Sequence, residues 1–190
     1  LCGGNVGKNE PSKRRKLIED FCKLNLPNVN VFLAEPVFKV LIREKHFENL
    51  LDIEEELSSF TDFIIIVLES ESSICELGAF ATKKELINKI IIINDENHRK
   101  SKSFITRGPN RKIEELKEGA DKILYYKMDM DGKKYGDAIG LIFPQLKSLL
   151  AYNPVKNRSR VRGVDPNIDL NKNSLRLLHD IIYFSQPLYF

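Results

Sequence analysis

Carboxylates and hydroxyls are concentrated in one short segment of this sequence, between Glu69 and Glu76. The segment reads Glu-Ser-Glu-Ser-Ser-Ile-Cys-Glu and continues as Leu-Gly-Ala-Phe. A carboxylate held early in a helix can attack a sugar carbon and form a covalent glycosyl intermediate. The spacing Ser73-x-x-Glu76 also matches a capping box, in which Glu76 would only hydrogen-bond the first amide of the helix. The residues alone leave both interpretations open.

A glycine-rich segment near the start of the chain is the second candidate for chemistry. It reads Gly3-Gly4-Asn5-Val6-Gly7 and precedes a helix that we expect to begin near Pro11. Glycines let the backbone approach a phosphate or a sugar closely, and a helix N-terminus favours anions. The spacing matches neither a Walker loop nor a clear dinucleotide fingerprint. A plain turn between a strand and a helix is therefore the alternative.

Alternating apolar runs and helical patterns must position these two segments. Strands are predicted over 29–34, 63–68, 89–94 and 123–126, and helices over 36–45, 48–60, 73–88 and 134–150. The runs at 63–68 and 89–94 lack polar alternation, which is typical of strands buried on both faces. We therefore expect an α/β fold, with an open parallel sheet and helices on both faces. Ligands of such sheets bind at the carboxyl ends of the strands, which selects the loops at 3–7, 35–36 and 69–73.

Composition excludes several other classes of protein. The chain has 190 residues, of which 42% are hydrophobic and 30% are charged. These values are ordinary for a globular protein and exclude collagen-like and wholly disordered chains. The densest apolar run, 63–68, is far shorter than the roughly 20 residues that cross a bilayer. The three cysteines, Cys2, Cys22 and Cys75, have no zinc-like spacing, which predicts free thiols, no metal site and a cytoplasmic location.

The last 39 residues differ in charge from the rest. Residues 152–190 hold six basic and three acidic residues, so the net charge of +3 lies in this segment. We divide the chain into an α/β domain over 1–151 and a basic linker with a short helical segment over 152–190. The helical segment could be the start of a truncated DNA-binding domain.

Arg158, Arg160 and Arg162 are the candidate nucleic-acid contacts of this tail. A solvated linker is the alternative interpretation. The basic run 13–16 opens a predicted helix, and it forms either a solvated face or a further contact to nucleic acid.

Five segments together resemble the nucleoside 2-deoxyribosyltransferase-like effector proteins of retron anti-phage systems. They are Leu1-Cys2-Gly3-Gly4, Glu35-Pro36, Asp62, the run from Glu69 to Phe80, and Lys100 to Ile105 followed by Gly108-Pro109. The resemblance spans roughly residues 1–115 and keeps order and spacing, although Ser72 stands where such proteins usually have glycine. It implies a Rossmann-like, deoxyribosyltransferase-like fold.

The resemblance also implies a role for each matched residue. Glu76 is the nucleophile, Asp62 and Glu69 are supporting carboxylates, Gly3 and Gly4 line the ribose-phosphate pocket, Ser73 caps the helix and contacts the ligand, and Glu35 reaches the substrate. The implied activity is an N-glycosidase that cleaves NAD or a related nucleotide as the toxic effector of a retron. NAD is then a substrate, and no cofactor is expected.

Two other functions stay open. The chain could be a nucleoside deoxyribosyltransferase of nucleotide salvage, or a nucleotide-sensing module without catalysis. The implied partners are a reverse transcriptase and its RNA–DNA hybrid, with no membrane and with an oligomer or higher assembly as a further expectation.

If the tail arginines contact nucleic acid, replacing Arg158, Arg160 and Arg162 by Gln should weaken binding to a retron RNA–DNA hybrid. The salt dependence should also fall, by up to about three units of slope, since each duplex phosphate contact contributes about 0.9. Affinities of both proteins at several salt concentrations measure this. An unchanged slope would mean that these arginines are solvated.

Overall fold

A parallel sheet of three strands forms the centre of the fold. Its strands are β3 (Ile64–Val67), β4 (Ile90–Asp95) and β5 (Ile123–Tyr126), and β4 lies in the middle. The N-terminal segment extends the sheet beyond β3, because Cys2 forms a parallel bridge with Ile66. The carboxyl end of β3 therefore lies beside the glycine residues that follow Cys2, and Gly4 N donates to the Glu69 side chain there.

This computed structural model describes residues 1–6, 10–33, 61–129 and 137–151, with the single positions 35, 49, 51, 54, 57 and 58. All of these residues belong to one compact unit, Leu1–Tyr152. The division of the chain after residue 151, the C-terminal helical segment and the three tail arginines concern residues outside the described part. No helix within the described ranges is long and apolar enough to cross a membrane.

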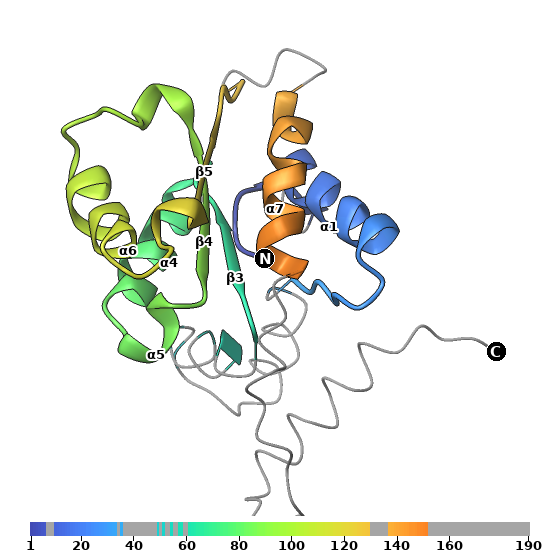
Figure 1. Ribbon diagram of the computed structural model, residues 1–190, viewed down its shortest axis with the longest axis horizontal. Coiled ribbons are helices and arrows are strands. Elements are labelled where there is room, and N and C mark those ends of the chain that lie inside the picture. Colours follow the sequence, from blue (N-terminus) through green and yellow to red (C-terminus); the bar gives the residue numbers. More distant parts are fainter. Residues whose placement is uncertain are drawn as a thin grey trace, which may run out of the picture. The chain divides into compact units, whose positions relative to one another are not determined.

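Helices cover both faces of the sheet (Figure 1). One face carries Ile65, Val67, Ile91, Ile93 and Leu124 and packs against α1 (Lys13–Asn25) and α7 (Phe143–Ala151). The other face carries Ile64, Ile66, Ile90, Ile92 and Ile123 and packs against α4 (Glu71–Ala81), α5 (Lys84–Ile87) and α6 (Arg111–Glu114). Successive residues of a strand point to opposite faces, so two covered faces require a continuous apolar run.

Short elements complete the described chain. They are the hairpin strands β1 (Asn5–Val6) and β2 (Glu10–Pro11), the 3-10 helices η1 (Glu96–His98), η3 (Ala120–Lys122) and η4 (Ala138–Ile142), and the π-helix η2 (Thr106–Asn110). The β1–β2 hairpin pairs antiparallel and stands just before α1.

Most of the strands predicted from the sequence are present in the structure. The α/β class, the parallel sheet, the helices on both faces and the strands at 63–68, 89–94 and 123–126 are confirmed. The strand predicted over 29–34 is wrong for its described residues, 29–33, which form no strand and contact the N-terminus through one bond, from Leu1 N to Phe32 O at 2.9 Å. The helices predicted over 36–45 and 48–60 fall almost wholly outside the described residues.

Two predicted helices differ in their bounds. The helix expected over 73–88 begins at Glu71 and is interrupted after Ala81, so that α4 and α5 are separate. The helix expected over 134–150 is the 3-10 turn η4 followed by α7. Pro144 lies in the first turn of α7, where its missing N–H costs little, and this favours a new helix start there.

Ile92, on the central strand, should be among the most sensitive core positions. Its side chain is fully buried, so Ile92→Ala should lower the free energy of unfolding by about 2–5 kcal/mol. Leu141→Ala is the matched control, because Leu141 is 75% exposed and should change stability by less than about 0.5 kcal/mol. Urea denaturation of the three proteins measures both effects. Equal effects would contradict the placement of the core.

Candidate functional site

Glu76 lies in the second turn of α4, and its carboxylate faces the N-terminal segment. Its charged and polar surroundings are the Cys2 thiol, the carboxylates of Glu35 and Glu54, and the guanidinium of Arg15. One carboxylate oxygen, Oε2, is buried and accepts no hydrogen bond from the described part of the chain. Buried polar atoms are nearly always paired, so an unpaired carboxylate oxygen is typical of a group that meets a ligand.

Burial, and after it the neighbouring carboxylates of Glu54 and Glu35, raise the pKa of Glu76, which is about 7. A hydrogen bond from the Cys2 thiol acts in the opposite direction, as does the positive charge of Arg15. Cys2 keeps its proton, because burial raises the pKa of this thiol to about 12. Glu76 is therefore a carboxyl group that ionises near neutral pH, as suits a catalytic carboxylate.

The N-terminus of α4 is capped by Ser70 and Ser73, without Glu76. Ser70 Oγ accepts a hydrogen bond from Ser73 N at 3.2 Å, and Ser73 Oγ accepts one from Ser70 N at 3.2 Å. The expectation that Ser73 begins the helix and forms a capping box with Glu76 is wrong, because the helix starts two residues earlier. Ser73 is fully buried, and its contact with a ligand stays a prediction. Ser72, which replaces a glycine, lies in the first turn of α4 and needs no left-handed backbone.

Glu69 binds the glycine segment to the sheet edge. Its Oε1 accepts hydrogen bonds from Gly4 N at 2.9 Å and from the Ser12 hydroxyl, and its Oε2 accepts one from Arg14 Nη1 at 2.9 Å. The side chain is only 4% exposed. Glu69 thus accepts the hydrogen bond that the Gly4 amide could otherwise donate to a bound anion, and it fixes the conformation of the loop.

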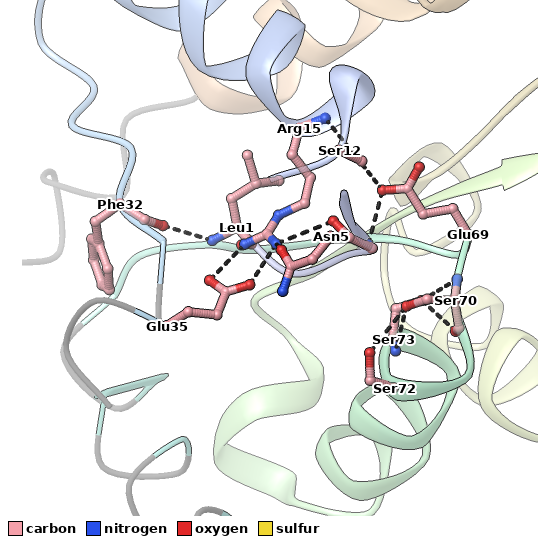
Figure 2. A network of polar contacts seen from close by, with 11 residues as sticks. Leu1, Asn5, Ser12, Arg15, Phe32, Glu35, Glu69, Ser70, Ser72 and Ser73 are labelled. Atoms are coloured by element: carbon pink, nitrogen blue, oxygen red, sulfur yellow. Dashed lines mark hydrogen bonds and ion pairs between the residues drawn. The ribbon is translucent and has the colours of Figure 1, made fainter. Parts of the chain in front are cut away.

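Arg15 is the centre of a second network, which Figure 2 shows. Its guanidinium donates to both oxygens of Glu35, at 2.5 and 2.8 Å, to Asn5 Oδ1 at 2.8 Å and to the Leu1 carbonyl at 2.8 Å. Arg15 is 1% exposed, and it lowers the pKa of Glu35 by this pairing, against the effect of burial. Glu35 is thereby held in the neighbourhood of Glu76, and its contact with the substrate stays a prediction.

The basic run 13–16 was expected to form a solvated face or a contact to nucleic acid. The solvated face is wrong for Arg14 and Arg15, which are largely buried. Arg14 is 14% exposed; it pairs with Glu69 and Asp137 and donates to the Asp129 carbonyl at 2.8 Å. Positive charge in the first turn of a helix is unfavourable by itself, and here it is offset by buried carboxylates. That mismatch was the signal in the sequence that could have identified both arginines.

Gly3 and Gly4 are small because side chains of this network fill the space beside them. A Cβ at Gly3 would lie 2.8 Å from Arg15 Cδ, and one at Gly4 would lie 3.2 Å from Glu69 Cγ. These glycines therefore admit Arg15 and Glu69, and their contact with a ribose phosphate stays a prediction.

Asp62 is not brought together with the other candidates. It precedes β3, whereas Glu69 and Glu76 follow that strand, so Asp62 lies at the opposite edge of the sheet and is exposed. Glu54 was not singled out from the sequence. It carries no motif of its own, and only tertiary structure places it near Glu76.

Comparisons with known proteins show which family this chain resembles. The family model described as STM3845 retron effector protein matches residues 10–190. Two similar Escherichia coli proteins, from retrons Ec73 and Ec86, are each named "putative ribosyltransferase/DNA-binding protein". The first is 41% identical over 99% of this chain and 61% of its own length, and the second is 37% identical over 58% of this chain and 35% of its own length. The chain thus spans about three fifths of the length of the first relative and matches about a third of the second.

The buried carboxyl of Glu76 should make stability depend on pH. Its pKa is raised to about 7 from 4.5, so the folded protein holds a proton that the unfolded chain has lost between these values. Stability relative to Glu76→Gln should therefore fall as pH rises from about 4.5 to 7, by an amount on the order of 2 kcal/mol. Urea denaturation of both proteins across this range measures the difference. The control is Glu85→Gln, which replaces an exposed carboxylate; the difference in unfolding free energy between wild type and this variant should not change with pH. If the difference between wild type and Glu76→Gln also stays constant, the raised pKa of Glu76 is contradicted.

Proposed function

This chain belongs to the STM3845 retron effector family, and on that premise we propose that it is an N-glycosidase. Its proposed substrate is NAD or a related nucleotide, and its proposed role is that of the toxic effector in retron defence. The names of the two relatives support glycosyl-transfer chemistry for this class of protein. The parallel sheet, extended by the N-terminal segment beside β3, supports a Rossmann-like, deoxyribosyltransferase-like domain.

The observation that carries the proposal is the state of Glu76. It is a carboxylate with a buried, unpaired oxygen, on the helix that follows β3, with a pKa of about 7. Because Ser70 and Ser73 cap that helix, a capping role does not explain why a carboxylate stands at position 76. A nucleotide sensor without catalysis would not need a carboxylate that is costly to ionise.

The proposed reaction has two steps. In the first, Glu76 attacks C1′ of the sugar while the bond from C1′ to the base nitrogen breaks and its electron pair leaves with the base. In the second, water attacks C1′, Glu76 leaves as a carboxylate, and one proton is released to solvent. This is the double displacement of retaining glycosidases, with an oxocarbenium-like transition state.

The charge of the site favours a substrate with positive charge near C1′. Among the described residues, the carboxylates of Glu35, Glu54 and Glu76 lie near one guanidinium, that of Arg15. A cationic nicotinamide ring would relieve their repulsion and favour the ionised, nucleophilic form of Glu76. Nicotinamide also leaves as a neutral molecule, so no general acid is required.

Control of this activity is proposed to involve a reverse transcriptase and its RNA–DNA hybrid in the cytoplasm. The support is the family, the words "DNA-binding" in the names of the two relatives, and the positive charge of residues 152–190. The candidate contacts are Arg158, Arg160 and Arg162.

Glu76→Gln should keep the fold and reduce turnover by several orders of magnitude, because an amide cannot form the glycosyl intermediate. The assay incubates the full chain with NAD and a panel of nucleosides and separates products by chromatography, with and without a free base as acceptor. Glu85→Gln is the control and should keep full activity. Normal turnover by Glu76→Gln would overturn the proposal, and base exchange without net hydrolysis would favour a deoxyribosyltransferase.

The pH dependence of kcat/KM provides a second test. Activity should rise with pH through about 7, since Glu76 must lose its proton before it can attack C1′. A profile that is flat from pH 5 to 8 would exclude this carboxyl as the nucleophile.

A further inference from the structure

A pocket of about 570 Å³ lies at the carboxyl ends of β3 and β4. Its walls come from the end of β3 and the first turn of α4, from the end of β4, and from the segment that leads into η2. The lining residues are Leu68, Glu69, Ser70, Glu71, Ile74, Asn94, His98, Ser103, Ile105 and Thr106. A volume of this size is typical of small-molecule sites.

The pocket is on a different flank of α4 from Glu76. Ile74 lines the pocket, and Glu76 follows it by two residues, which is a rotation of about 200° around an α-helix. Glu76 instead faces Cys2 and Arg15, and it is not among the lining residues. The two places share only the loop that carries Glu69 and Ser70.

Asn94 supplies a polar group that points to a ligand. It lines the pocket but is only 3% exposed, and its Oδ1 accepts a hydrogen bond from Asp95 N at 2.8 Å. Its Nδ2 donates no hydrogen bond within the described part of the chain. This amide nitrogen is not one of the fully buried unpaired atoms of the described residues, so it is accessible from the pocket, where a ligand or a water molecule can accept from it.

The other lining residues define the chemistry of that ligand. Leu68, Ile74 and Ile105 provide apolar surface, and Ile74 is 40% exposed. Ser103 and Thr106 add hydroxyls that hydrogen-bond to each other at 3.0 Å. The lining residues in the described part include no Lys or Arg. Glu71 contributes an exposed carboxylate, whereas the carboxylate of Glu69 is already paired with Gly4, Ser12 and Arg14. The lining thus favours a flat, uncharged ring with hydrogen-bonding edges and disfavours a phosphate.

We propose that this pocket is a second binding site, separate from Glu76, that takes a neutral nucleoside. The base lies against Ile74 and Ile105, and a carbonyl or ring nitrogen of the base accepts from Asn94 Nδ2. The sugar extends toward Glu71 and the hydroxyls at the rim. The site does not depend on the catalytic role of Glu76.

Binding of adenosine, guanosine, cytidine, uridine and AMP to the full chain, measured by titration calorimetry, tests the proposal. The Glu76→Gln protein is used so that turnover does not interfere, and the same titrations are repeated on the wild type with nucleosides that it does not cleave. At least one nucleoside should bind to both proteins with the same Kd, and AMP should bind less tightly than adenosine. No binding of any nucleoside, tighter binding of AMP, or binding that requires Glu76 would overturn the proposal.

Two variants in the Glu76→Gln protein locate the site. Asn94→Asp keeps the acceptor for Asp95 N and removes the donor, so Kd should rise about tenfold or more. Ile74→Ser acts at an exposed position where folding is safe, and should also raise Kd, whereas the control Leu141→Ser should not. If Asn94→Asp does not fold, the Kd values of Ile74→Ser and Leu141→Ser are compared instead. Equal Kd values for these two variants would refute the site.

Discussion

The guanidinium of Arg15 holds together the part of this protein where chemistry is concentrated. It is almost fully buried, and a buried positive charge is stable only with close partners. Those partners come from two separate parts of the chain: the Leu1 carbonyl and the side chain of Asn5 in the N-terminal segment, and the carboxylate of Glu35. The N-terminal segment, α1 and Glu35 are therefore fixed relative to one another by one side chain.

The neighbouring Arg14 extends this arrangement to the carboxyl edge of the sheet. It pairs with Glu69, whose other oxygen accepts from Gly4, and it reaches the carbonyl that follows β5. Glycine at positions 3 and 4 is a consequence, since a Cβ there would collide with Arg15 or press on Glu69. The described part of the glycine segment is thus shaped by internal ion pairs, and its contact with a ribose phosphate stays a prediction.

α4 separates two environments at this edge. On one flank, Glu76 lies among carboxylates and a buried thiol, where ionisation is disfavoured. On the other flank, an open pocket combines apolar side chains with the amide of Asn94. The reciprocal cap of Ser70 and Ser73 fixes the first turn between them, so both flanks depend on where this helix begins.

The sequence by itself determined the class of fold, and it singled out Glu76 as the candidate catalytic carboxylate. Apolar runs such as Ile90 to Ile93 can be buried only between two layers of helices, and for that reason local pattern was enough to predict the sheet. The motif around Glu76 was visible for a similar reason, because its residues are neighbours in the chain. The start of α4 was misjudged, since Ser70 and Ser73 both favour a cap and only the backbone path after β3 selects between them.

Tertiary structure decided which charges meet. Arg14 and Arg15 follow one another in a run of four basic residues. Their unfavourable place in the first turn of a helix is a local sign that they are paired, but it does not identify their partners. Their carboxylate partners are 20 or more residues away in the chain. Asp62 is close to Glu69 in sequence, yet the two lie at opposite ends of β3, so the length of that strand separates them. The burial of Glu76, and therefore its raised pKa, depends on the packing of distant segments. A local sequence pattern cannot predict such packing.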